Sequence, residues 1–123
     1  MQNYNSKFKT DLTQRCYNFS LAVIQVTDDL PNKRSAWVIT DQLVRSSTSI
    51  GANLVEARAS SSRLEFKKFH EIALKSANET KYWLNLLKDS KLSSEKEVDP
   101  LLAEVTEISN MLASGVLKLK AKS

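Results

Sequence analysis

The 123-residue sequence contains few residues that interrupt regular structure, with only two glycines and two prolines. A chain so poor in turn formers has few places for hairpins, which favours a small number of long helices. Its one cysteine, Cys16, cannot form an internal disulfide, which fits a reducing cytoplasm. No apolar run approaches the ~18 residues that cross a bilayer, and the opening MQNYNSKFKTDL lacks the apolar core of a secretory signal. We therefore expect a cytoplasmic protein without a membrane-spanning helix.

The composition is that of an ordinary globular domain, because 41% of the residues are hydrophobic and 26% are charged. A chain of this length is expected to form one domain, 1–123, that buries roughly 65% of the surface of its unfolded form. The formal net charge is +4. This mild basicity is compatible with a nucleic-acid partner, but it is also common in proteins that bind no nucleic acid.

Hydrophobic residues recur every three or four positions in four stretches, which is the spacing of one face of an α-helix. In the first stretch, Cys16, Phe19 and Val23 follow this spacing. The sequence shows no strand-type alternation and no internal repeat. The pattern predicts an all-α fold, namely an up-down-up-down, antiparallel four-helix bundle. The expected helices cover residues 6–30, 34–59, 62–89 and 94–120.

Two capping boxes mark helix starts, one made by Ser62 with Glu65 and one by Ser94 with Glu97. Pro100 lies six positions beyond Ser94, where its ring is expected to clash with a carbonyl one turn back. Either the last helix kinks at this point, or it restarts with Asp99 as the cap and Pro100 as the first residue. The sequence alone does not decide between the two.

The stretch SSTSIGANLVEA, residues 46–57, could be a phosphate-binding loop or a serine-bearing catalytic turn. A phosphate loop needs several glycines between a strand and a helix, and a nucleophile elbow needs glycine on both sides of the serine. The helical period instead continues through Gly51, so we interpret the stretch as helix, with Trp37 and Val55 widening its apolar stripe. We expect Ser76, Ala77 and Thr80 to meet Ser47 and Gly51 across a tight helix crossing.

Two features point to a subunit interface. The first helix carries a second apolar stripe, for which a neighbouring subunit is the natural partner. The helix over 34–59 carries a polar row that is either a solvated face or a hydrogen-bonded seam between subunits, with Arg45 and Glu56 pairing across it. The candidate interface residues are Tyr17, Leu21, Ile24, Gln42, Arg45, Ser49, Asn53 and Glu56.

The sequence offers little for catalysis or metal binding. His70 is the only histidine, and the Glu-x-x-His pairs typical of bundle metal sites are absent. Cys16 falls on the core stripe, where a small buried hydrophobe is expected, and no partnering base for it is evident. We expect no catalytic residue, no metal and no cofactor, and hence a protein that is not an enzyme.

The basic residues are spread along the chain, and most have an acidic neighbour one helical turn away. Repeated around an oligomer, their fields would add and could hold RNA or DNA without reading its sequence. The alternative is a protein–protein adaptor whose charges serve only solubility. The candidate nucleic-acid-binding residues are Arg58, Arg63, Lys67, Lys68, Lys75, Lys118 and Lys120.

The segments TDQLVRSSTSIGANLVEA and EFKKFHEIALKSANETKYWL together resemble the 23S rRNA-intervening-sequence proteins, a bacterial four-helix-bundle family. The family patterns read like TDQLRRAAxSIPANIAEG and IAxGSxxE. The chain departs from them at Gly51, Ala57 and Lys75. Residues that match are Thr40, Asp41, Gln42, Leu43, Arg45, Ser49, Ile50, Ala52, Asn53, Glu56, Phe66, Ile72, Ala73, Ser76 and Glu79.

The resemblance implies more about assembly than about chemistry. The family is similar to the accessory protein of diversity-generating retroelements, a basic pentameric barrel that binds nucleic acid and assists a reverse transcriptase. It therefore implies a ring-like homopentamer that is non-catalytic and associated with nucleic acid. It also implies a possible reverse-transcriptase-like or other protein partner. This is an analogy at the level of fold, which does not by itself fix function.

Overall fold

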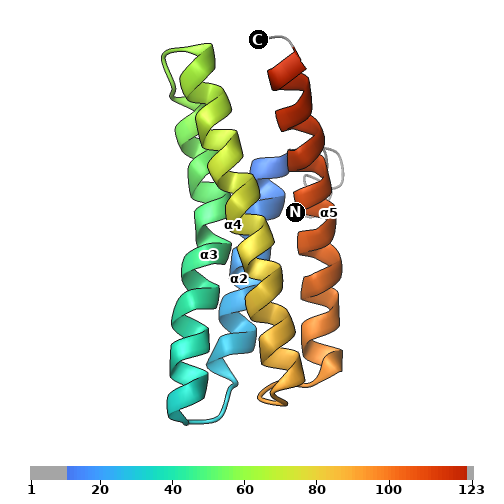
Figure 1. Cartoon of the computed structure of the whole chain (residues 1–123). Helices are drawn as coiled ribbons and strands as arrows, with labels where there is room; N and C mark the ends of the chain where they lie inside the picture. Colours follow the sequence, from blue (N-terminus) through green and yellow to red (C-terminus); the bar gives the residue numbers. More distant parts are fainter. Residues whose placement is uncertain (1–10, 122–123) are drawn as a thin grey trace.

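The computed structural model describes residues 11–121, which form four α-helices and no strand (Figure 1). The all-α prediction is therefore confirmed. Residues 6–10 of the first expected helix lie outside the described residues. The helices are α2 (Leu12–Asp28), α3 (Arg34–Arg58), α4 (Arg63–Asp89) and α5 (Glu95–Ala121).

The helices form a bundle in which each packs against two others, and the connections lie at alternate ends (Figure 1). The α2–α3 and α4–α5 turns are at one end and the α3–α4 turn at the other. Packing is most extensive between α3 and α4 and least extensive between α2 and α5. None of these helices is long and apolar enough to cross a membrane.

Side-chain caps fix where three of the helices begin. Asp11 accepts a hydrogen bond from the Thr13 amide at 3.1 Å and starts α2. At the start of α4, the Ser62 hydroxyl accepts from the Glu65 amide at 3.1 Å, while the Glu65 carboxylate accepts from the Ser61 amide at 2.9 Å. The predicted box is therefore present, with its return bond shifted by one residue.

Pro100 lies inside α5 rather than at its start. The helix begins at Glu95, and Ser94 caps it by accepting from the Glu97 amide at 3.2 Å. The alternative in which the helix restarts at Asp99 is therefore wrong. Asp99 instead accepts a hydrogen bond from the ammonium of Lys88, at 2.8 Å.

The core consists of aliphatic side chains, and small residues fill the contact between α3 and α4. Leu43, Ile50, Leu84 and Ile108 are fully buried. Trp37 and Val55 were expected to widen the apolar stripe of α3, but they are 58% and 53% exposed. Trp37 stays exposed because its indole N–H donates a hydrogen bond to the side-chain oxygen of Asn32, in the turn before α3, at 2.9 Å.

Candidate interaction surfaces

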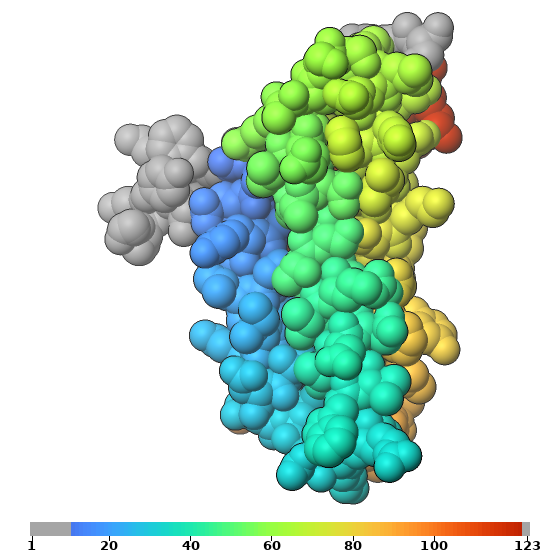
Figure 2. Space-filling model, turned by 90° about the vertical axis from the view of Figure 1, so that its left-hand side faces the viewer, coloured from blue at the N-terminus to red at the C-terminus, as the bar shows by residue number. Residues whose placement is uncertain are grey.

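A furrow runs between α2 and α3 on the side of the molecule seen in Figure 2, where α2 is blue and α3 is teal to green. Its volume is about 410 Å³. We call it the α2–α3 groove. None of its lining residues is charged. They are Thr13, Tyr17, Ser20, Leu21, Ile24, Thr48, Gly51, Ala52 and Val55.

Apolar side chains on the rim of this groove are open to solvent. Tyr17 is 62% exposed, Leu21 47% and Ile24 38%. The second apolar stripe of the first helix therefore lies on the surface, beside the exposed Val55 of α3. Their role in a subunit interface stays a prediction.

Gly51 forms part of the groove and sets the distance between its two helices. A Cβ atom at this position would lie 3.2 Å from the Cβ of Cys16 and 3.8 Å from the Cys16 carbonyl carbon. Such a contact is tighter than ordinary van der Waals packing, so α2 and α3 approach closely because Gly51 has no side chain. The expectation that Gly51 faces α4 is wrong, because the backbone that approaches it belongs to α2.

Small hydroxyl residues do mediate a close crossing between α3 and α4, but with other partners than expected. The Thr80 hydroxyl donates to the Ser46 hydroxyl at 2.9 Å, and both side chains are buried. One turn away, the hydroxyls of Ser49 and Ser76 are 2.9 Å apart. Every buried polar side-chain atom among residues 11–121 has a hydrogen-bond partner. The small residues of SSTSIGAN thus allow both neighbours of α3 to come close.

The polar row of α3 lies next to α4, and most of its members form hydrogen bonds within the chain. The row consists of Gln42, Arg45, Ser49, Asn53 and Glu56. Asn53 donates to the Ser49 carbonyl at 2.8 Å and to its hydroxyl at 3.0 Å. Arg45 donates to the Gln42 side chain at 2.8 Å and pairs with Glu79 of α4. Glu56 is exposed. The row therefore lies at the α3–α4 boundary, and pairing of Arg45 with Glu56 across subunits stays a prediction.

Glu79 links this row to an aromatic residue of α4. Its carboxylate accepts a hydrogen bond from the indole N–H of Trp83 at 2.8 Å as well as from Arg45. The Trp83 bond is the main cause that holds the pKa of Glu79 below its usual value. Burial opposes this lowering, and the hydrogen bond and charge of Arg45 add to it. Glu79 and Trp83 are functional candidates that the sequence did not single out as a pair.

Six of the seven candidate nucleic-acid-binding residues lie near the α3–α4 turn or near the end of α5, which are at the same end of the bundle (Figure 1). The seventh, Lys75, lies at the middle of α4. Three of the seven have partners in the chain. Arg58 pairs with Asp11 at 3.1 Å, Arg63 donates to the Leu119 carbonyl at 3.2 Å, and Lys120 lies 3.8 Å from Glu71. Lys67, Lys68, Lys75 and Lys118 have no ion-pair partner among residues 11–121.

A shallow hollow of about 420 Å³ between α4 and α5 brings several of these lysines together. Lys68, Lys75 and Lys120 line it, with Glu71 among them. Phosphate groups could approach the ammonium groups here, although the Glu71 carboxylate opposes part of their field. The role of the seven residues in nucleic-acid binding stays a prediction.

The positive charge of the chain is not concentrated in its helices. Of eighteen basic residues, Lys7, Lys9 and Lys122 lie outside residues 11–121, whereas all fourteen acidic residues lie inside. The described part therefore holds fifteen basic and fourteen acidic residues. Any strong attraction for nucleic acid must come from the local arrangement of lysines or from the terminal segments, since the bundle itself is close to neutral.

The titratable groups of residues 11–121 do not form a recognisable catalytic arrangement. Cys16 is fully buried, and burial raises the pKa of its thiol to about 12, so it stays protonated at neutral pH. A ring nitrogen of His70 lies 3.0 Å from the Phe66 carbonyl, and the two rings are 4.4 Å apart. Within residues 11–121, no group of three histidine, cysteine or acidic side chains is placed to hold a metal ion.

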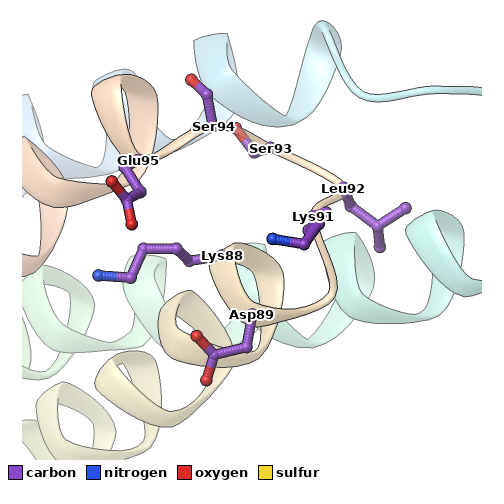
Figure 3. Close-up of a pocket in the computed structure, with 7 residues that line it drawn as sticks. All are labelled: Lys88, Asp89, Lys91, Leu92, Ser93, Ser94 and Glu95. Atoms are coloured by element: carbon purple, nitrogen blue, oxygen red, sulfur yellow. The ribbon is translucent and has the colours of Figure 1, made fainter.

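A second hollow, of about 550 Å³, lies at the α4–α5 turn (Figure 3). Its lining includes two basic and two acidic side chains, and Figure 3 shows Lys88 extending past Glu95, with Asp89 pointing away from both. The ammonium of Lys88 is held by Asp99, whose hydrogen bond raises the pKa of Lys88. Lys91 has a left-handed backbone, with φ of 63°. The hollow is the outside of a tight turn, and it offers no nucleophile paired with a base.

Comparison with known proteins places the chain in one family. The family model described as "23S rRNA-intervening sequence protein" matches residues 9–114. A similar solved structure is that of a protein of unknown function from the S23 ribosomal protein family of Bacteroides thetaiotaomicron, with 34% sequence identity and a TM-score of 0.80. The alignment covers 85% of this chain and 97% of that one. No curated protein matches the chain significantly.

Proposed function

Because the chain belongs to the family of 23S rRNA-intervening sequence proteins, we propose that it is a non-catalytic scaffold that associates with copies of itself and binds RNA or DNA. The observation that carries the proposal is the α2–α3 groove. Tyr17, Leu21 and Ile24 expose a continuous apolar stripe beside it, and exposed apolar patches of this kind mark association sites. The resemblance suggests a ring of five copies. The single cysteine, Cys16, fits a location in the reducing cytoplasm.

Association would place several copies of the basic end of the bundle in one assembly. In a ring, the lysines of α4 and α5 repeat around the axis, so that phosphates meet many ammonium groups although residues 11–121 of each chain are nearly neutral. Binding of this kind releases counterions and falls steeply with rising salt. A reverse-transcriptase-like protein is the partner suggested by the resemblance.

Self-association is tested by measuring molar mass with size-exclusion chromatography and light scattering. Wild-type protein is expected to elute as an assembly of several 13.9 kDa chains. Leu21→Glu places a charge in the groove and should give monomers. Leu117→Glu is the matched control, because Leu117 of α5 is 67% exposed and lies outside the groove. A monomeric wild type would contradict the scaffold proposal.

Nucleic-acid binding is tested by fluorescence anisotropy with a labelled structured RNA and a labelled DNA duplex at about 50 and 200 mM salt. The triple variant with glutamine at Lys67, Lys68 and Lys75 should bind more weakly. Each lost phosphate contact should lower the slope of log affinity against log salt by about 0.9 for a duplex. The same substitutions at Lys33, Lys81 and Lys96 change net charge equally and should have a much smaller effect.

A protein–protein adaptor is the second candidate function, and the near neutrality of residues 11–121 favours it. In that case the α2–α3 groove receives a different protein and the lysines only keep the chain soluble. Equal anisotropy curves for wild type and the Lys67, Lys68 and Lys75 variant, or no binding at either salt concentration, would favour the adaptor over the nucleic-acid scaffold.

A further inference from the structure

A second exposed surface lies on the other side of α3, where α3 packs against α4. Val38 is 56% exposed, Tyr82 61% and Leu86 37%. Val38 lies two turns before Arg45 on α3, and Tyr82 and Leu86 lie one and two turns after Glu79 on α4, so all three share the side of the Arg45–Glu79 pair. We call Val38, Arg45, Glu79, Tyr82, Trp83 and Leu86 the α3–α4 surface.

This surface combines the residue types that dominate binding energy at protein interfaces, namely tryptophan, tyrosine and arginine. Its charges are already neutralised within the chain, since Glu79 holds both Arg45 and the Trp83 indole. A surface whose charges are paired can enter an apolar environment without burying an unpaired charge, which is the costly event in interface formation.

The α2–α3 groove has the complementary properties. It is concave, it is lined by uncharged residues, and Gly51 and Ala52 leave its floor low. A furrow pressed against the same furrow of another copy would leave a void, whereas a protruding side chain can fill it. Self-association through this groove alone is therefore poorly supported by its shape.

The groove also provides acceptors suited to a phenol. The Ser20 hydroxyl donates to the Cys16 carbonyl at 3.0 Å, and the Thr48 hydroxyl donates to the Val44 carbonyl at 2.7 Å. Each hydroxyl has a single hydrogen to donate, so both oxygens keep lone pairs that can accept a hydrogen bond. A tyrosine entering the groove could bury its ring and donate its O–H there.

We propose that the α2–α3 groove of one copy takes the α3–α4 surface of a second copy, with Tyr82 as the side chain that enters it. This inference rests on the proposed self-association and adds which surfaces meet. The contact is head-to-tail, so each copy offers one groove and one α3–α4 surface, both of which flank α3. Contacts of this kind build closed rings or open filaments rather than symmetric pairs.

The test is a mixing experiment with two variants, each damaged on one surface. Leu21→Glu removes the groove and keeps the α3–α4 surface, whereas Tyr82→Glu does the reverse. Each variant alone should be a monomer of 13.9 kDa by light scattering. Their equimolar mixture should form dimers of twice that mass and nothing larger, because only one contact between two intact surfaces is available.

Several outcomes would overturn this inference. If wild type assembles and Tyr82→Glu assembles equally well, the α3–α4 surface takes no part. If the mixture stays monomeric although each variant is folded by circular dichroism, the two surfaces do not bind each other. A monomeric wild type would instead remove the proposed self-association itself. Leu117→Glu should assemble like wild type, and Ile24→Glu should reproduce the Leu21→Glu result if that variant fails to fold.

Discussion

The two sides of the bundle that flank α3 differ in chemistry from the two that flank α5. Almost all exposed large hydrophobic residues among residues 11–121 lie on α2, α3 and α4, and α5 contributes only Leu117. Most ion pairs in the same range involve α5. Arg15 of α2 is hydrogen-bonded to Glu104 at 2.7 Å and to Glu107 at 2.6 Å, which raises its pKa above the usual value.

The exposed surfaces on the two sides of the bundle therefore differ in how they meet the solvent. Next to α5 the surface side chains are polar and form ion pairs, and such exposed pairs add little stability. On the α3 sides, apolar side chains remain open beside uncharged or internally neutralised neighbours. The helix α5 is therefore the solvated edge of the protein, whereas α3, with its two flanks, is the helix suited to association.

The largest difference in stability is expected between substitutions at the two glycines, Gly51 in α3 and Gly115 in α5. Gly51→Val would force α2 away from α3, because even its Cβ would lie 3.2 Å from Cys16. We expect it to lower the free energy of unfolding by about 2 kcal/mol, measured by urea denaturation at fixed protein concentration. Gly115→Val on α5 has nothing within 4 Å of its Cβ and should leave stability unchanged or slightly raised.

The buried hydroxyl pair between α3 and α4 should give the next effect. Thr80→Val keeps the shape of the side chain but removes the hydroxyl that donates to Ser46 at 2.9 Å. The loss should be about 1.5 kcal/mol in the same denaturation experiment. Ser109→Ala is the counterpart on α5, where the hydroxyl bonds only to Thr106 of its own helix, and it should be close to neutral. Equal losses would contradict the contrast.

The Glu79 carboxylate should make the α3–α4 contact sensitive to acid. Its folded pKa is depressed, so its stabilisation is complete above the unfolded value of about 4.3 and disappears as the pH falls through the folded pKa. Glu79→Gln should therefore cost about 0.5 kcal/mol at neutral pH, reduced by solvent screening since the side chain is 37% exposed. Thermal unfolding should show this difference vanish in acid. A difference that persists below pH 3 would assign it to packing instead.

The smallest effect should come from an ion pair of α5. Lys120 lies 3.8 Å from Glu71, and both side chains are well exposed. A double-mutant cycle with Lys120→Gln and Glu71→Gln should give a coupling of about 0.3 kcal/mol or less, screened further by salt. A coupling above about 1 kcal/mol would show that the α5 sides are held by charge more firmly than this comparison allows.

The sequence predicts the helices well because each one depends on local periodicity and capping. Ser62 with Glu65 marks the start of α4, and the second stripe of Tyr17, Leu21 and Ile24 is correctly placed away from the core. Partners between helices are harder, because periodicity gives the face of a helix but not the neighbour or the turn it meets. Gly51 of α3 is expected from the sequence to contact α4, but it contacts α2. The Arg45–Glu79–Trp83 contact depends on how α3 and α4 are aligned along their axes, and only packing sets that alignment.

The most direct test of the central claim is hydroxyl-radical footprinting of the wild-type protein, read by mass spectrometry at low and high protein concentration. If the flanks of α3 are the association surfaces, oxidation of Tyr17 and Tyr82 should fall several-fold as the assembly forms. Leu117 should be oxidised equally at both concentrations. Protection of Leu117, with Tyr17 and Tyr82 unchanged, would contradict the account and place the contact on α5.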